Sequence, residues 1–204
     1  MKSIKITILG IAMLILTGCG GSSSLMVKSS PQTVPAPDPA MATIVFMRSS
    51  FVGGAVNVEL FEIENGNLKF IGSLPNGTKI AHRTTPGSKT YMAFGAVADY
   101  MLTDNLAGGQ TYYVIVRPNW GSGGFAPTPV RKEGPSDYTM KAKEFKSWIS
   151  NKLIQPKPQE SEKWFEKTRA KYEKIHQEFW PRFQEKTSDQ KKERTLTTAD
   201  GVKN

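Results

Sequence analysis

Hydrophobic and polar positions alternate over short runs between residues 41 and 130, as they do in β-strands. β-Branched and aromatic residues fill these runs, and Gly, Pro and Asn residues separate them. About 90 residues with this pattern suit one small β-sandwich, so residues 41–130 are predicted to form a mainly β domain. The predicted strands span residues 42–48, 55–64, 67–74, 79–83, 89–94 and 110–117.

The dipeptide Asn65-Gly66 is the strongest turn signal, because both residues tolerate the positive φ of a type I′ hairpin. The predicted cross-strand pairs are Ile63 with Leu68, Glu62 with Lys69, and Phe61 with Phe70. The apolar pairs then share one face of the hairpin, and the ion pair lies on the other. Farther from the turn, the apolar positions shift to the opposite face at Val56, Val58 and Leu60. Either both faces are covered there or a β-bulge intervenes.

Residues 136–187 are rich in charged and helix-forming residues and are predicted to form an α-helical extension. Candidate helices span residues 138–153 and 160–185, with Pro156 and Pro158 between them. Pro181 is predicted to kink or end the second helix. Along this helix a stripe recurs at three- and four-residue spacing at Phe165, Thr168, Tyr172, Ile175 and Phe179. This stripe is a candidate binding surface that packs on the sandwich, binds a partner or lies on a membrane.

Residues 1–18 have the features of a signal peptide, since Lys2 and Lys5 precede an apolar run over residues 6–16. A transmembrane helix needs roughly 20 apolar residues, and neither this run nor any later segment is that long. We therefore expect export and cleavage rather than a membrane-spanning helix.

The run Leu16-Thr17-Gly18-Cys19 resembles the lipobox of bacterial prolipoproteins. The resemblance implies cleavage before Cys19, acyl chains on its sulfur and its new amino group, and attachment to a lipid bilayer; two or three chains make a stable anchor. The alternative is an ordinary cysteine near a cleaved signal peptide. Cys19 is the only cysteine, so no internal disulfide is expected. Gly20 occupies the position where an aspartate would resemble an inner-membrane retention signal. Its presence favours the outer membrane, with the domain facing the periplasm or the cell surface.

Two flanking segments are predicted to lack stable structure. Residues 19–40 are rich in Ser, Gly and Pro and are interpreted as a flexible tether. Residues 188–204 have almost no apolar content and are interpreted as a disordered tail.

The net charge of +9, which falls to +7 when Lys2 and Lys5 are removed, lies mostly after Val130. Such charge suits anionic lipid headgroups or an acidic polymer, but a solvated helix face of mixed charge is the favoured interpretation. Nucleic acid is not an expected partner of an exported, tethered domain.

Candidate chemistry is sparse. His82 and His176, the only histidines, lie in different segments, so no metal or cofactor site is predicted; His82 is expected on the sheet surface and His176 on a solvated helix face. No catalytic motif is present, so an enzyme is not expected. The aromatic residues Trp120 and Phe125, near Tyr112 and Tyr113, either form a platform for a sugar or a peptide or pack within the sandwich, and packing is favoured.

Four segments, in their order along the chain, resemble the bacterial lipoprotein family known as domain of unknown function 2846. They are residues 43–48, 70–74, 85–87 and 107–116. The resemblance covers about residues 42–117 and implies a small β-sandwich similar to carboxypeptidase-regulatory and PEGA-type modules. It implies no catalytic residues.

These patterns together predict a non-enzymatic envelope lipoprotein that presents a β-sandwich and a helical arm to another envelope component. The alternative is a glycan-binding module for peptidoglycan or lipopolysaccharide.

Overall fold

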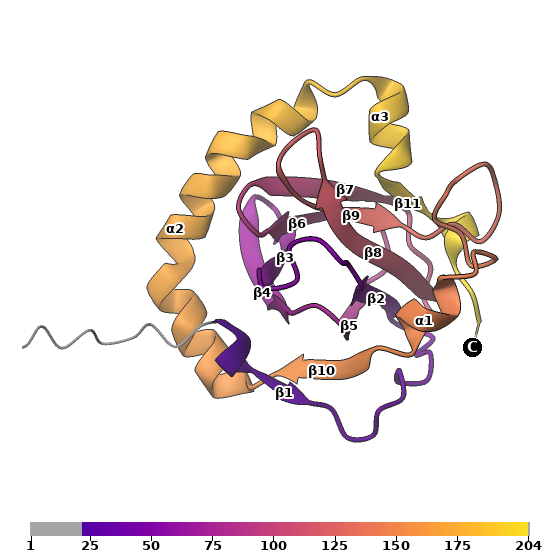
Figure 1. The fold of residues 1–204 in the computed structure, drawn as a ribbon, viewed down its shortest axis with the longest axis horizontal. Helices are drawn as coiled ribbons and strands as arrows, with labels where there is room; N and C mark the ends of the chain where they lie inside the picture. The colour runs from indigo at the N-terminus through magenta and orange to yellow at the C-terminus, as the bar shows by residue number, and fades with distance from the viewer. Residues whose placement is uncertain (1–21, 204) are drawn as a thin grey trace, which may run out of the picture.

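A computed structural model describes residues 22–203 of the chain (Figure 1). The first strands are β1 (Met26–Lys28), β2 (Ala42–Arg48), β3 (Val58–Glu64), β4 (Asn67–Leu74), β5 (Thr78–Thr84) and β6 (Thr90–Phe94). The remaining strands are β7 (Ala98–Asp104), β8 (Thr111–Asn119), β9 (Gly124–Pro129), β10 (Lys152–Pro156) and β11 (Thr195–Thr197). The helices are η1 (Ser22–Leu25), α1 (Phe145–Ile149), α2 (Pro158–Gln184), α3 (Ser188–Glu193) and η2 (Thr198–Asp200), of which η1 and η2 are 3-10 helices.

Two sheets enclose the main hydrophobic core. The first sheet has the strand order β1-β10-β5-β2-β8-β9, and the second has the order β11-β7-β6-β3-β4. Alternate residues of the two sheets meet between them, among them Phe46, Val114, Leu60 and Tyr91, all nearly or fully buried. The prediction of a mainly β sandwich with a C-terminal helical extension is therefore confirmed.

The predicted hairpin is present in its predicted register. Asn65 and Gly66 both have positive φ, and Phe61 pairs with Phe70 beside them. A register shift between Leu60 and Phe61 marks a β-bulge. Both faces of β3 are also covered, so both of the alternatives offered for this strand hold.

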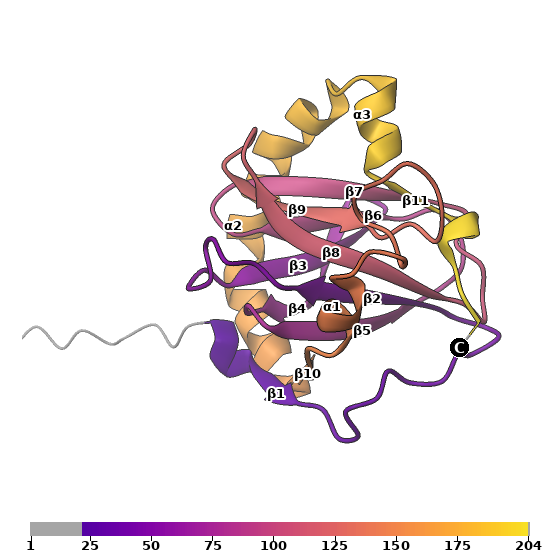
Figure 2. The same cartoon turned by 45° about the vertical axis from the view of Figure 1, so that its right-hand side comes forward.

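The outer face of the second sheet is covered by α2, which curves around the edge of the sandwich (Figures 1 and 2). Phe165 and Tyr172 pack against Phe61 with ring centroids 5.7 and 4.7 Å apart, and Ile175 and Phe179 pack against the same cluster. Burying such side chains contributes about 1.5 to 3 kcal/mol each. The apolar stripe of α2 therefore belongs to the protein's own core.

The helix predicted over residues 138–153 is wrong except for the single turn of α1 (Phe145–Ile149). The chain then enters β10, which pairs in parallel with the edge of β5. Main-chain pairing with that edge overrides the helical preference of these residues. The helix predicted over residues 160–185 is present as α2 (Pro158–Gln184), which continues past Pro181 instead of ending there, and Phe183 of its last turn packs on Tyr100 at 5.5 Å.

The prediction of a flexible tether is wrong for residues 22–40. β1 pairs antiparallel with β10, and the Gln32 side chain donates to the Leu153 carbonyl at 2.8 Å. Leu25 is buried, and its carbonyl accepts from the Lys157 amide. Strand pairing and main-chain hydrogen bonds need few apolar side chains, which is why composition misses this segment.

The disordered tail predicted for residues 188–204 is wrong across the described residues 188–203. Thr187 and Gln190 form a capping box at the start of α3, and β11 then pairs in parallel with β7. Leu196 is fully buried in the main core. One apolar residue and several hydrogen bonds are sufficient to order this segment.

Candidate functional site

A cavity of about 660 Å³ lies where the edge strands of the two sheets meet, between β8, β9, the loop after β9, and the segment from α3 to η2. Three arginines line the cavity: Arg117 on β8, Arg131 in the loop, and Arg194 between α3 and β11. Tyr138, in the loop after β9, also lines the cavity. We call this the arginine cavity; its volume suits a small-molecule group.

Arg131 fixes the C-terminal wall of the arginine cavity. Its guanidinium donates to the Asp200 carboxylate at 2.7 Å and to the carbonyls of Thr195 and Lys192 at 2.7 and 2.8 Å. Asp200 in turn accepts from the amide and the hydroxyl of Thr197, both at 2.9 Å. The donors of Arg131 are thus used to hold the wall in place.

Arg194 is a buried guanidinium with long contacts. It donates to the Pro127 carbonyl at 3.3 Å and lies 3.5 Å from the Asp99 carboxylate. Burial lowers the pKa of Arg194, Asp99 opposes this shift, and the neighbouring charge of Arg117 lowers the pKa further. The positive charges of Arg117 and Arg194 therefore repel one another.

Arg117 has no carboxylate partner among the described residues. Its guanidinium lies over the Tyr138 ring, 4.7 Å from the centroid, and donates only to the adjacent Pro118 carbonyl at 3.4 Å. Its buried Nε has no hydrogen-bond partner. The Nε is enclosed by the protein, so the part of Arg117 that can meet a ligand is the rest of its guanidinium, which lines the cavity without a carboxylate.

The arginine cavity has the chemistry of an anion site. A planar guanidinium binds a carboxylate or a phosphate through two parallel hydrogen bonds, and the repulsion between Arg117 and Arg194 falls when an anion lies between them. Four exposed acidic residues and one exposed lysine form part of the rim: Glu133, Asp137, Asp189, Glu193 and Lys192. No histidine or cysteine is among the described residues that line the cavity.

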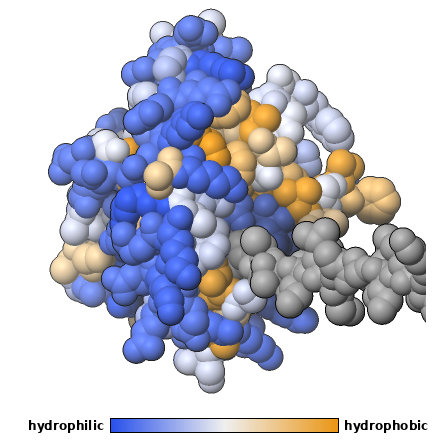
Figure 3. Space-filling model, turned by 90° about the vertical axis from the view of Figure 1, so that its left-hand side faces the viewer, coloured by the Kyte–Doolittle hydropathy of each residue, from blue (hydrophilic) through white to orange (hydrophobic). Residues whose placement is uncertain are grey.

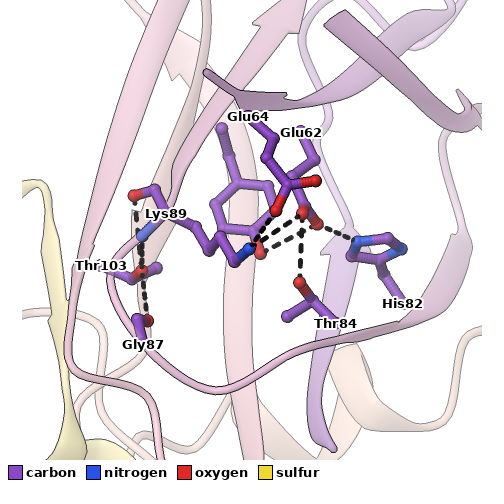
Figure 4. Close-up of polar contacts among 8 residues, drawn as sticks. Glu62, Glu64, His82, Thr84, Gly87, Lys89 and Thr103 are labelled. Atoms are coloured by element: carbon purple, nitrogen blue, oxygen red, sulfur yellow. Dashed lines mark hydrogen bonds and ion pairs between the residues drawn. The ribbon is translucent and has the colours of Figure 1, made fainter. Parts of the chain in front are cut away.

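A second charged cluster connects the two sheets at one end of the sandwich (Figure 4). Glu62 of β3, which is 2% exposed, accepts from His82 Nε2 at 2.5 Å and from the Thr84 hydroxyl at 3.1 Å, both on β5. The hydroxyl of Tyr91 lies 3.4 Å from the same carboxylate, and Lys89 Nζ lies 3.8 Å away. We call these five residues the Glu62 cluster.

The Glu62 cluster is internally satisfied. Burial alone would raise the pKa of Glu62, but the hydrogen bond and charge of His82, together with Thr84 and Lys89, lower the pKa below its ordinary value. The carboxylate is therefore ionised and accepts a hydrogen bond from His82 Nε2. Lys89 also donates to Glu64 at 2.8 Å. No hydroxyl or thiol of the described residues is bonded to the other ring nitrogen of His82, so the geometry is that of a cross-link between sheets.

Both histidines differ from the sequence-based expectation. His82 points into the sandwich and contributes to the Glu62 cluster instead of lying on the sheet surface. His176 is half-buried, its Nδ1 lies 3.1 Å from the Tyr100 hydroxyl, and burial lowers its pKa. The register also pairs Glu62 with Lys69 as predicted, but the carboxylate turns to His82.

The other predicted site residues do not form a free binding surface. Phe125 is buried in the main core, whereas Trp120 is 78% exposed, so the two do not form one platform. Phe165 and Tyr172 are buried under α2, and Ile175 and Phe179 are partly buried there. Cys19, the predicted lipidation site, lies outside the described residues.

Sequence reasoning did not identify the three arginines of the cavity. They lie far apart along the chain, in a strand, a loop and a segment predicted to be disordered. The only sequence signal is the excess of basic residues after Val130, which does not single out any one of them.

Within residues 22–203, no group of histidine, cysteine and acidic side chains is arranged to hold a metal ion. No helix of that part of the chain is both long and apolar enough to cross a membrane. Comparison with known proteins found no protein-family model and no curated protein that matches the chain.

Proposed function

We propose that this protein is a membrane-anchored lipoprotein of the bacterial cell envelope that binds, without catalysing a reaction, an anionic group of another envelope component in the arginine cavity. The lipobox-like run that ends at Cys19 supports the anchor. One observation supports the binding role: the Arg117 guanidinium lines the cavity without a carboxylate partner among the described residues. Such a guanidinium is available for charge-assisted hydrogen bonds to an acceptor from outside the chain.

The ligand class is a carboxylate or a phosphate attached to a glycan or a peptide. Peptidoglycan supplies carboxylates, and lipopolysaccharide supplies phosphates, so both envelope polymers carry the required chemistry. The proposal therefore keeps the glycan-binding hypothesis and gives it a site. A helical arm that offers its apolar stripe to a partner is not part of the proposal, because Phe165 and Tyr172 are buried against the sandwich.

The anchor is tested by substitution of Cys19. Native protein grown with radiolabelled fatty acid should carry the label and fractionate with membranes, whereas Cys19→Ala should carry none. Label on the substituted protein would show that Cys19 is not the acylated residue.

The binding role is tested by titration of the detergent-solubilised full-length protein with two soluble probes. One probe is a muropeptide with free carboxylates, and the other is a bisphosphorylated disaccharide without acyl chains. We expect one of them to bind and Arg117→Gln to weaken its binding about tenfold or more, because a hydrogen bond to a charged group contributes about 1.5 to 3 kcal/mol.

Lys132→Gln is the matched control. It removes one positive charge from an exposed lysine beside Arg131 that does not line the cavity. The affinity of Lys132→Gln for the probe should be close to that of the native protein. Equal weakening by both substitutions would indicate general charge attraction, and absence of binding by either probe would refute the proposed ligand class.

A further inference from the structure

Three large apolar side chains are exposed on two loops at one end of the sandwich. Phe51 is fully exposed and Val52 partly so in the loop between β2 and β3, and Trp120 is 78% exposed in the loop between β8 and β9. Large aromatic side chains held in water are uncommon on a monomer unless the surface is used.

The backbone beneath the first of these loops is held firmly. The fully buried Arg48 donates to the carbonyls of Gly53 at 2.6 Å, Leu74 at 3.0 Å and Val56, and its guanidinium lies 4.4 Å from the centre of the Phe125 ring. Burial lowers the pKa of Arg48 to about 10, so it stays charged at neutral pH. Because these bonds fix the loop, the exposure of Phe51 is built into the fold.

The loops converge on one buried ring. A Cβ atom on Gly53 would lie 2.7 Å from the Phe125 ring, and one on Gly95 would lie 2.6 Å from it. A Cβ atom on Gly124 would lie 2.6 Å from the Val97 carbonyl. The loops at residues 49–57, 95–97 and 120–123 therefore form one continuous surface, which we call the loop face.

The described chain begins on the same side of the molecule. The Met26 sulfur, just after η1, accepts from the Ser73 amide at 3.3 Å, and Asn76, three residues further, exchanges hydrogen bonds with Ser50 beside Phe51. In Figure 2 the loops after β2 and β8 project to the side where η1 lies. Figure 3 shows apolar side chains gathered there, next to the polar surface of α2.

The length of chain before this point limits the distance to the anchor. Cys19 precedes Ser22 by three residues, and three residues span at most roughly 11 Å even when extended. A domain held by acyl chains on Cys19 is therefore close to the bilayer, with the side of the molecule that bears the loop face beside the attachment point.

The flank of α2 next to the loop face is basic. Lys163, Lys167, Lys171 and Lys174 are all exposed, and their spacing of four, four and three residues places them along one flank of the helix. The Lys171 ammonium lies 5.8 Å from the centre of the Phe94 ring, which directly precedes Gly95 of the loop face. Each such lysine contributes about 1 kcal/mol near an anionic membrane surface.

We propose that the loop face lies on the lipid headgroups of the membrane that holds Cys19, with Phe51 and Trp120 inserted at the interface and the α2 lysines against anionic lipids. Aromatic side chains at the headgroup level and basic side chains beside them are the usual composition of such contacts. This inference rests on the acyl anchor of the proposed function and is independent of the ligand in the arginine cavity.

The test uses the full-length acylated protein in vesicles of anionic phospholipid with brominated acyl chains, which quench tryptophan fluorescence on contact. We expect brominated lipid to quench part of the emission of the native protein, and we expect this quenching to disappear in Trp120→Phe. Trp180→Phe is the matched control, because Trp180 packs on Tyr100 at 5.0 Å in the α2 cluster, and it should retain the quenching. Trp120 is 78% exposed and has little packing to lose, and phenylalanine at position 180 keeps an aromatic ring against Tyr100.

The outcomes separate this inference from the proposed function. Acylated, vesicle-bound protein that shows no Trp120-dependent quenching would refute the membrane contact and leave the anchor standing; a protein partner would then be the candidate for the loop face. Failure of fatty acid labelling at Cys19 would refute the anchor and the membrane contact together. Equal quenching in zwitterionic and in anionic vesicles would refute the role of the lysines.

Discussion

The Glu62 cluster and the arginine cavity are both built from charged side chains at the margin of the sandwich, but they differ in whether those charges are satisfied. Glu62 accepts hydrogen bonds from two residues of β5 in the opposite sheet, and Lys89 supplies the positive charge. Arg117 has one long bond to its neighbour's carbonyl and no carboxylate. A buried carboxylate that is fully bonded serves the fold, whereas a cavity-lining guanidinium without a carboxylate is available to a ligand.

This difference implies opposite consequences of substitution. Removing the carboxylate of Glu62 leaves its partners buried and unpaired, so it should cost stability. Removing the guanidinium of Arg117 leaves no partner behind, so it should cost binding and little stability.

Glu62→Ala should lower the free energy of unfolding by about 3 to 5 kcal/mol, the usual result of removing one partner of a buried ionic pair. Urea denaturation of the full-length protein in detergent measures the change. Glu64→Ala is the control, since Glu64 is 54% exposed and its pair with Lys89 contributes about 1 kcal/mol or less. Similar losses in the two variants would mean that the Glu62 cluster does not join the sheets.

The same cluster predicts the direction of acid sensitivity. The folded-state pKa of Glu62 lies below its ordinary value of 4.5, so its stabilisation is fully present above that pH and is lost as the pH falls through the folded-state pKa. Unfolding followed from neutral pH into this acid range should show a steeper loss for the native protein than for Glu62→Gln. Equal slopes would show that Glu62 is not the titrating group.

Asp200→Asn should cost about 1 to 3 kcal/mol, because the Asp200 carboxylate holds both Arg131 and Thr197. The C-terminal wall of the arginine cavity should loosen, and anion affinity should fall with stability. Asp189→Asn is the matched control at an exposed rim position, with an expected change of about 0.5 kcal/mol or less. Thermal unfolding with and without ligand separates the two effects.

Much of the sandwich could be predicted because its central strands carry their own signals. β2 (Ala42–Arg48) and the hairpin around Asn65 have β-branched or aromatic residues and a turn that fixes the register. The edge strands lack such signals. β9 (Gly124–Pro129) contains Pro127 and Pro129, which lowers its strand propensity, yet an edge strand tolerates proline. β10 and β11 exist because the neighbouring edges of β5 and β7 offer unpaired main-chain groups.

The candidate site was beyond sequence reasoning for a related physical reason. Arg131 and Arg194 line one cavity only because a segment with one buried apolar residue, Leu196, adds a strand to the second sheet. The Glu62–His82 pair likewise depends on two sheets facing each other, whereas cross-strand reasoning within one hairpin finds only Lys69. Side chains that meet through tertiary packing leave no periodic pattern along the chain.

The smallest stability effect is expected at Arg117, and it completes the contrast with Glu62. Arg117→Met keeps a long stem that can pack against Tyr138 while it removes an unpaired buried Nε and a charge that repels Arg194. The free energy of unfolding should therefore change by about 0.5 kcal/mol or less, with any change upward, as is common when a binding residue is replaced. Anion binding should be lost.

Arg131→Met is the matched control for this last prediction, because it makes the same substitution in the same cavity at a guanidinium whose donors are used by the protein itself. It should cost about 1 to 3 kcal/mol. Chemical denaturation of both variants, followed by titration with the anionic probe, gives stability and binding for each. If Arg117→Met instead lowers the free energy of unfolding by more than about 1.5 kcal/mol, its effect matches that expected for the bonded Arg131. Arg117 would then be a structural residue, and the observation on which the binding role rests would be removed.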